Sequence, residues 1–148
     1  VIWIPCDPNE IAECEKRNEL PLCHADGILH AIDENTILLS NYIDYDPEYR
    51  LKLLERLSPY FNIKEFQFGD IRTENSWIYI NYLQVGNVVL MPVVNEKADD
   101  VAAEQLKEFL QVESVIQIDS CELTFEASDG NIGGSLHCIS WNVFDSSI

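Results

Sequence analysis

Apolar and polar residues alternate in the first third of the chain in an order that predicts a hairpin of two strands. The apolar run 28–32 predicts the first strand, and the run 36–40, rich in β-branched and apolar residues, predicts the returning strand. The polar triplet 33–35 between them is typical of a turn. We therefore expect a two-stranded hairpin over residues 28–40.

A helix and a third strand follow this hairpin in the pattern. Asp46 and Pro47 predict the helix start, because aspartate accepts hydrogen bonds from the free backbone amides there and proline fits the first helical position. The leucines that follow recur at helical spacing as far as Ser58 and Pro59, which predict the helix end. Residues 63–68 then alternate between apolar and polar side chains, so we expect a strand with one buried face.

The same order of elements recurs in the second half of the chain. The expected elements are a strand at 77–83, a turn at 86–87, a strand at 88–91, a helix from 99 and a strand at 115–118. The two helix starts, near Pro47 and Asp99, are 52 residues apart. Because repetition at such a period is typical of stacked or radial units, we expect strand-strand-helix-strand modules in series.

This pattern predicts one α/β domain over residues 1–148 that contains whole and partial modules. The expected whole modules span about 24–70 and 75–120, and the partial modules span 1–23 and 121–148. The apolar run 1–5 predicts the last strand of an earlier module, and the run 136–144 predicts the first strand of a later one. We therefore expect further modules before Val1. Uncovered module faces favour a homo-oligomer or association with that upstream half.

Composition and charge exclude several classes of partner. Hydrophobic residues make up 47% of the chain and charged residues 24%, which is typical of a globular protein, and no apolar run reaches the length of a membrane helix. A net charge of −17 argues against nucleic-acid and anionic-membrane partners, because both bind clustered Lys and Arg. The acidic balance slightly favours a small cationic substrate.

The cysteines indicate a reducing environment. There are five of them, an odd number without a C-x-x-C pair, which argues against a secreted disulfide framework and against a zinc site. We therefore expect free thiols and a cytoplasmic protein. No phosphate-binding glycine loop or zinc-protease motif occurs, so we expect neither a cofactor nor a metal.

His24 and Asp26 form the first candidate for chemistry. They sit two residues apart at the entry to the first expected strand, where side chains at i and i+2 share one face. An imidazole and a carboxylate on one face could hold a planar cation and move protons to or from it. The alternative is a polar strand entry in which Asp26 and Gly27 only form part of a turn.

Cys138 is the second candidate, as a thiolate nucleophile. It follows the segment 128–134, whose Gly133 and Gly134 let the backbone approach a bound substrate closely. The alternative is a cysteine that serves only as a small buried apolar residue. In an extended segment, His137 would point to the opposite face from Cys138, so we assign it no proton transfer.

The string that begins at His24-Ala25-Asp26 and the segment 133–138 (GGSLHC), in this order, resemble motifs of guanidino-group-modifying enzymes of the pentein superfamily. The resemblance is to the branch of agmatine deiminase and bacterial peptidylarginine deiminase. It implies a pentein-type β/α-propeller of five modules, of which this chain would be the C-terminal half. Cys138 matches the nucleophile of that branch, whereas His137 matches only a flanking residue.

The same resemblance implies a reaction. Enzymes of this branch hydrolyse a guanidinium group, so the expected substrate is agmatine or a peptidyl-arginine-like compound. The implied catalytic residues are Cys138, His24 and Asp26, and the implied substrate-binding residues are Asp26, Gly133 and Gly134. Two alternatives stay open, namely an amidinotransferase and a non-catalytic fragment that lacks the upstream acidic residues of the site.

Overall fold

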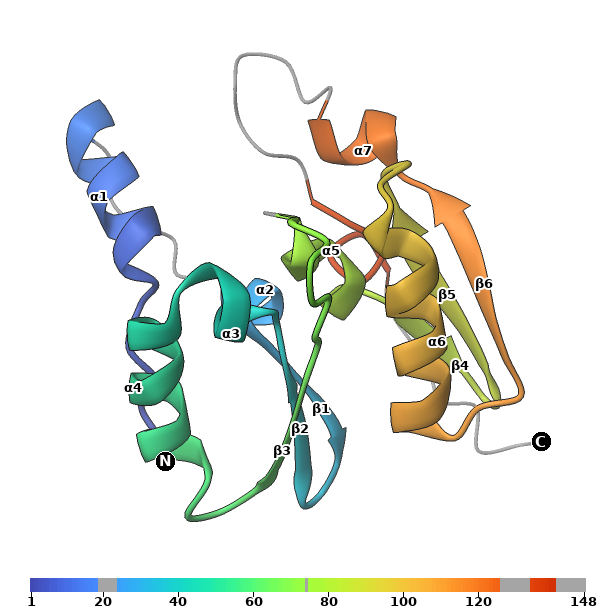
Figure 1. Ribbon diagram of the computed structural model, residues 1–148, viewed down its shortest axis with the longest axis horizontal. Coiled ribbons are helices and arrows are strands. Elements are labelled where there is room, and N and C mark those ends of the chain that lie inside the picture. Colours follow the sequence, from blue (N-terminus) through green and yellow to red (C-terminus); the bar gives the residue numbers. More distant parts are fainter. Residues whose placement is uncertain (19–23, 74, 126–133, 141–148) are drawn as a thin grey trace. The chain divides into compact units, whose positions relative to one another are not determined.

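Two three-stranded sheets with the same strand order form the framework of the chain (Figure 1). The computed structural model describes residues 1–18, 24–73, 75–125 and 134–140. It divides the chain into two units, Val1–Ile80 and Asn81–Ile148, each of which contains one of the sheets. The expected α/β class and the strand-strand-helix-strand order are both confirmed.

The first unit contains the expected hairpin, helix and closing strand. Its elements are β1 (Leu29–Asp33), β2 (Thr36–Leu39), α4 (Pro47–Leu57) and β3 (Asn62–Glu65). β1 runs antiparallel to β2, and β3 runs parallel to β2 on its other side. Asp46 caps α4 as expected, because its Oδ1 accepts a hydrogen bond of 2.9 Å from the backbone N–H of Tyr49.

The second unit repeats this plan. Its elements are β4 (Leu83–Val85), β5 (Val88–Val93), α6 (Ala98–Leu110) and β6 (Ser114–Asp119). β4 is antiparallel to β5, and β6 is parallel to β5. Gly86 adopts a φ of 58° in the expected turn between β4 and β5, a conformation that glycine reaches without steric cost.

The repeat extends to the register of the strands. Thr36 pairs with Asn62 in the first sheet, and Val88 pairs with Ser114 in the second. Both residues of the second pair lie 52 positions after those of the first, which is the offset that the helix starts predicted. The two modules therefore share one backbone plan although their side chains differ.

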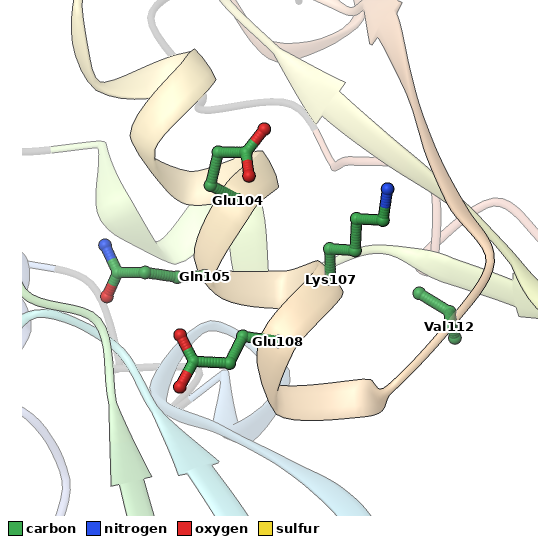
Figure 2. A pocket seen from close by; sticks show the side chains of 5 residues that line it. All are labelled: Glu104, Gln105, Lys107, Glu108 and Val112. Carbon is green, nitrogen blue, oxygen red and sulfur yellow. The ribbon is translucent and has the colours of Figure 1, made fainter.

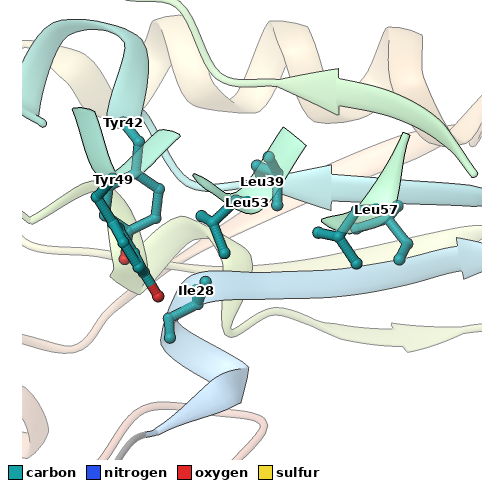
Figure 3. Close-up of a cluster of buried hydrophobic side chains, with 7 residues drawn as sticks. Ile28, Leu39, Tyr42, Tyr49, Leu53 and Leu57 are labelled. Carbon is teal, nitrogen blue, oxygen red and sulfur yellow. The ribbon is translucent and has the colours of Figure 1, made fainter. Parts of the chain in front are cut away.

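A cluster of apolar side chains holds α4 against the first sheet (Figure 3). Tyr49, Leu53 and Leu57 lie on one face of α4, at a spacing of four residues, and they pack with Leu39 of β2. Tyr42, in α3 (Tyr42–Tyr45), meets Tyr49 edge-on with ring centroids 4.9 Å apart. Because full burial of such a side chain stabilises by about 1.5–3 kcal/mol, this cluster is the main attachment of α4.

Two of the expected strands are wrong. Residues 1–5 form no strand; instead Ile4 packs against the α4 cluster, and the carbonyl of Pro5 accepts a hydrogen bond of 2.7 Å from Tyr49 Oη. Most of the expected strand 77–83 is helix α5 (Ser76–Ile80), in which residues 78–80 are fully buried. Burial on all sides of this short helix outweighs the strand preference of its β-branched and aromatic residues.

The expected strand at 136–144 is also wrong where it can be compared. Residues 136–139 form a turn that the backbone hydrogen bond from Ile139 N to Ser135 O closes at 3.3 Å. The rest of that run lies outside the described residues. A turn leaves these backbone groups unavailable for strand pairing, so this part of the chain starts no further sheet.

Among the helices that the sequence pattern did not predict is α1 (Pro8–Arg17). It begins after Asp7, whose side chain accepts a hydrogen bond of 2.8 Å from the backbone N–H of Asn9. No helix among the described residues is long and apolar enough to cross a membrane.

The expectation of free thiols is wrong at Cys6. Cys14, Cys121 and Cys138 carry thiols that form no disulfide, whereas Cys6 is disulfide-bonded. Cys23 lies outside the described residues. Disulfides join cysteines whose Cα atoms lie within about 7 Å of each other, and the absence of a C-x-x-C pair says nothing about such contacts.

Candidate active site

His24 and Asp26 lie at the start of a short helix rather than on a strand. α2 (Ala25–Ile28) begins directly after His24, and β1 follows it. The expectation that strand alternation places both side chains on one face is therefore wrong. The helical turn nevertheless brings them near each other, with 4.0 Å between His24 Nδ1 and Asp26 Oδ1. Their side chains are 65% and 35% exposed, so both are accessible to a ligand.

The core of the first unit anchors this short helix. Ile28, its last residue, is buried in the α4 cluster, and its carbonyl accepts a hydrogen bond of 3.1 Å from Ser40 N. A Cβ atom added at Gly27 would lie 3.7 Å from Trp77 Cβ, which shows that α2 approaches α5 closely. These contacts hold the backbone of α2 in place, while the side chain of Asp26 stays 35% exposed.

Cys138 is presented on the turn 136–139 of the second unit and is exposed. Its backbone N–H donates to Asn81 Oδ1 at 3.2 Å, and its Sγ donates to the same oxygen at 3.3 Å. The backbone N–H of His137 donates to the carbonyl of Asn81 at 3.1 Å. The cysteine is therefore not the buried packing residue of the alternative interpretation. Because the segment is not extended, the strand argument about His137 does not apply.

Gly134 lies against the cysteine. A Cβ atom at this position would come within 3.0 Å of Cys138 Cβ and 3.6 Å of Cys138 Sγ. The first distance is tighter than most contacts of a Cβ atom, so a larger residue here would require the cysteine or the turn to shift slightly. The expected role of the glycine segment in substrate binding stays a prediction. Gly133 lies outside the described residues.

The structure brings His24 together with Asp26 in the first unit and Cys138 together with Gly134 in the second. The meeting of these two groups around one substrate stays a prediction. Sequence reasoning missed Asn81, which is 1% exposed and directly precedes Tyr82 in an otherwise apolar run. A single amide in such a run was the signal that could have identified it.

Other surfaces of the described residues offer less chemistry. No group of three His, Cys, Asp or Glu side chains within the described ranges could hold a metal ion. Figure 2 shows a pocket beside α6. The residues that line it are Glu104, Gln105, Lys107, Glu108 and Val112. None of them is a candidate site residue, and they include no nucleophile.

Comparison with known proteins identifies the class and then the family. The repeated module places the chain among the pentein-fold proteins, of which the solved agmatine deiminases described below are examples. Residues 16–143 match the model of the Porphyromonas-type peptidyl-arginine deiminases, and the chain belongs to this family. No curated protein sequence matches the chain.

Solved structures show the same fold. An agmatine deiminase of Enterococcus faecalis is 15% identical with a TM-score of 0.63, and 94% of this chain aligns with 43% of that protein. An agmatine deiminase of C. jejuni is 22% identical with a TM-score of 0.56, and 78% of this chain aligns with 36% of that protein. The chain thus spans less than half the length of these two relatives.

Proposed function

We propose that this chain carries the nucleophile-bearing part of an enzyme that hydrolyses a guanidinium group in agmatine or a peptidyl-arginine-like compound. The observation that carries this proposal is the exposed Cys138 on a tight turn against Gly134, in a chain that belongs to a deiminase family. The two aligned agmatine deiminases are consistent with a guanidino substrate.

Substrate binding is proposed for Asp26. A guanidinium is planar and cationic, and a carboxylate can hold it in one orientation through paired hydrogen bonds. The side chain of Asp26 is 35% exposed, so a ligand can reach part of it. The net charge of −17 attracts a cation over a longer range.

The reaction then has two stages. The thiolate of Cys138 adds to the guanidinium carbon, and a tetrahedral adduct forms. The C–N bond breaks as the His24 imidazolium protonates the departing ammonia, which leaves a covalent thiouronium on the cysteine. Neutral His24 next takes a proton from water, the hydroxide adds to the same carbon, and the C–S bond breaks. The added hydroxyl loses its proton to the solvent as the C–S bond breaks, and the released ammonia takes up a proton, so the products are a ureido compound, ammonium and the regenerated thiolate.

The test measures ammonia and ureido product released from agmatine, free arginine and arginyl peptides by the complete natural protein. Cys138→Ser should abolish turnover, because a hydroxyl is a far weaker nucleophile near neutral pH. Cys121→Ser is the matched control, since Cys121 is another cysteine of the second unit that forms no disulfide, and it should keep the parent rate. Asp26→Asn should weaken binding of the cation and leave the fold intact.

Three outcomes would overturn the proposal. Full activity of Cys138→Ser would remove the nucleophile from the mechanism. Binding of agmatine without turnover by the parent protein would favour the non-catalytic alternative. Transfer of the amidino group to an added amine, rather than to water, would identify an amidinotransferase.

A further inference from the structure

Asn81 has an arrangement that simple packing does not require. Its side chain is 1% exposed, yet one atom of it, Oδ1, accepts hydrogen bonds from both the backbone N–H and the Sγ of Cys138. Its own carbonyl accepts a hydrogen bond of 3.1 Å from the backbone N–H of His137, the residue before Cys138. A residue 57 positions away in the sequence therefore fixes the cysteine turn at three points.

We propose that Asn81 is a positioning residue for the reaction, which fixes the backbone and the sulfur of Cys138 and holds that sulfur as the protonated thiol until a cation binds. The proposal rests on the proposed function, because only that function makes Cys138 the nucleophile.

The chemistry of the contact determines which form of the sulfur is held. A carbonyl oxygen accepts a hydrogen bond from S–H, whereas a thiolate offers no proton and places its charge against the lone pairs of that oxygen. The backbone N–H of Cys138 donates to the same Oδ1. This second hydrogen bond orients the Asn81 amide so that its oxygen, and not its nitrogen, faces the sulfur. In the absence of substrate, the contact therefore favours the thiol.

A bound guanidinium changes this balance. Its positive charge beside the sulfur favours the thiolate, so the nucleophile becomes reactive when a cation is present. Loss of Asn81 should then have two separable effects. The resting sulfur should become easier to ionise, and it should also become less well aimed at the substrate carbon, which lowers kcat.

The chain contains a matched contrast in Asn95 and Cys121. There the amide nitrogen Nδ2 of Asn95 donates to the sulfur at 3.2 Å, which is the opposite polarity. This hydrogen bond lowers the pKa of Cys121, although burial, as the larger cause, leaves that pKa raised overall. Asn95→Gly removes the donor and suits the φ of 61° at this position.

The experiment measures the alkylation rate of each cysteine by iodoacetamide against pH, with the modified peptides identified by mass spectrometry, in the full chain. Asn81→Ala should shift the profile of Cys138 to lower pH and raise its rate at pH 8 by about threefold or more. Asn81→Asp keeps an acceptor and adds a negative charge, so it should shift the profile to higher pH. Asn95→Gly should move only the profile of Cys121, to higher pH.

Shifts of the Cys138 alkylation profile to lower pH in Asn81→Ala and to higher pH in Asn81→Asp would support the positioning role. Profiles equal to that of the parent in both variants would overturn it. If either variant unfolds, the alkylation profile of the parent protein can still overturn the proposal. A midpoint for Cys138 below about pH 7 would contradict a resting thiol, because an ordinary cysteine titrates near 8.5. Turnover is measured separately. A kcat reduced about 10²-fold in Asn81→Ala is expected, and an unchanged kcat would refute positioning.

The alkylation assay needs no deiminase activity. If Cys138→Ser were fully active, the proposed function would fail while the alkylation profiles still reported whether Asn81 holds the thiol. If the profiles showed no effect of Asn81 while Cys138→Ser was inactive, only the positioning role would fail.

Discussion

In the proposed reaction, His24 performs two proton transfers, because it protonates the departing ammonia and then activates water. We expect His24→Ala to lower kcat for guanidinium hydrolysis by about 10²–10⁴-fold, the usual contribution of a general acid–base. The fold should be unaffected, because this side chain is 65% exposed. His137→Ala is the control and should keep the parent kcat. Equal losses in the two variants would show that His24 has no special role.

Burial of tyrosines gives the stability of the chain a defined pH dependence. Burial raises the pKa of Tyr82 above its ordinary value of 10.0, so the folded state favours the neutral phenol. The resulting stability is fully present below pH 10 and is lost as the pH rises above it, because the unfolded chain ionises first.

The free energy of unfolding, measured by denaturant titration at several pH values, should therefore fall above pH 10. It should fall more slowly in Tyr82→Phe, by up to about 1.4 kcal/mol for each pH unit. Tyr60→Phe is the control, because that residue is 66% exposed, and it should retain the parent slope. A slope that is the same in the parent and in Tyr82→Phe would contradict this account.

Single residues also show what a sequence can and cannot reveal about the site. His24, Asp26 and Cys138 could be nominated from residue types and their order, because chemistry-bearing side chains occur in recognisable motifs. Asn81 stands out in the sequence only as a single amide in an apolar run, and its role could not be predicted, since that role comes from contacts with a residue 57 positions away. Local patterns carry no information about such a contact, and only the fold creates it.

At the scale of elements, helix caps were the most reliable signal and strand propensity the least. The Asp46 and Pro47 pair correctly located the start of α4. The same pair occurs as Asp7 and Pro8 before α1, where few apolar side chains follow to draw attention to a helix. The aromatic and β-branched run of α5 predicted a strand, and tertiary burial overrode that preference.

The cap of α4 can be tested directly. Asp46→Ala removes the acceptor for the Tyr49 amide, so the free energy of unfolding should fall by about 1 kcal/mol. Asp44→Ala, a change of a neighbouring exposed acid, should alter it by less than about 0.5 kcal/mol. Chemical denaturation of the two variants beside the parent measures both values. Equal effects would mean that charge, and not the capping hydrogen bond, is responsible.

At the scale of the whole molecule, each sheet has two faces, and helix α6 packs on one face of the second sheet. Val89 and Met91 are fully buried, whereas Ile116, whose strand pairing places it beside Leu90, is 46% exposed. Val85, in the same sheet, is 60% exposed. Apolar strand residues that are this exposed are typical of surfaces that bind another protein segment.

We therefore expect the isolated chain to self-associate or to require an upstream segment for solubility. Sedimentation velocity over a range of concentrations should show species larger than 17.0 kDa, and Ile116→Lys should shift them toward the monomer. Lys64→Arg, a conservative change in the other sheet, is the control and should leave the distribution unchanged. A parent chain that stays monomeric throughout would contradict the expectation.

The two short helices that precede the hairpins, α2 and α5, occupy equivalent positions in the repeat but differ in how exposed their residues are. His24 and Asp26 at α2 are accessible, whereas Tyr79 and Ile80 of α5 are fully buried. Asn81, which holds the cysteine turn, directly follows α5. Under the proposed function, selection for substrate binding acts on the exposed residues at α2, whereas α5 is constrained by the interior that it fills. Substitutions at α2 would therefore change substrate specificity. Substitutions at α5 would instead destabilise the protein and lower its abundance.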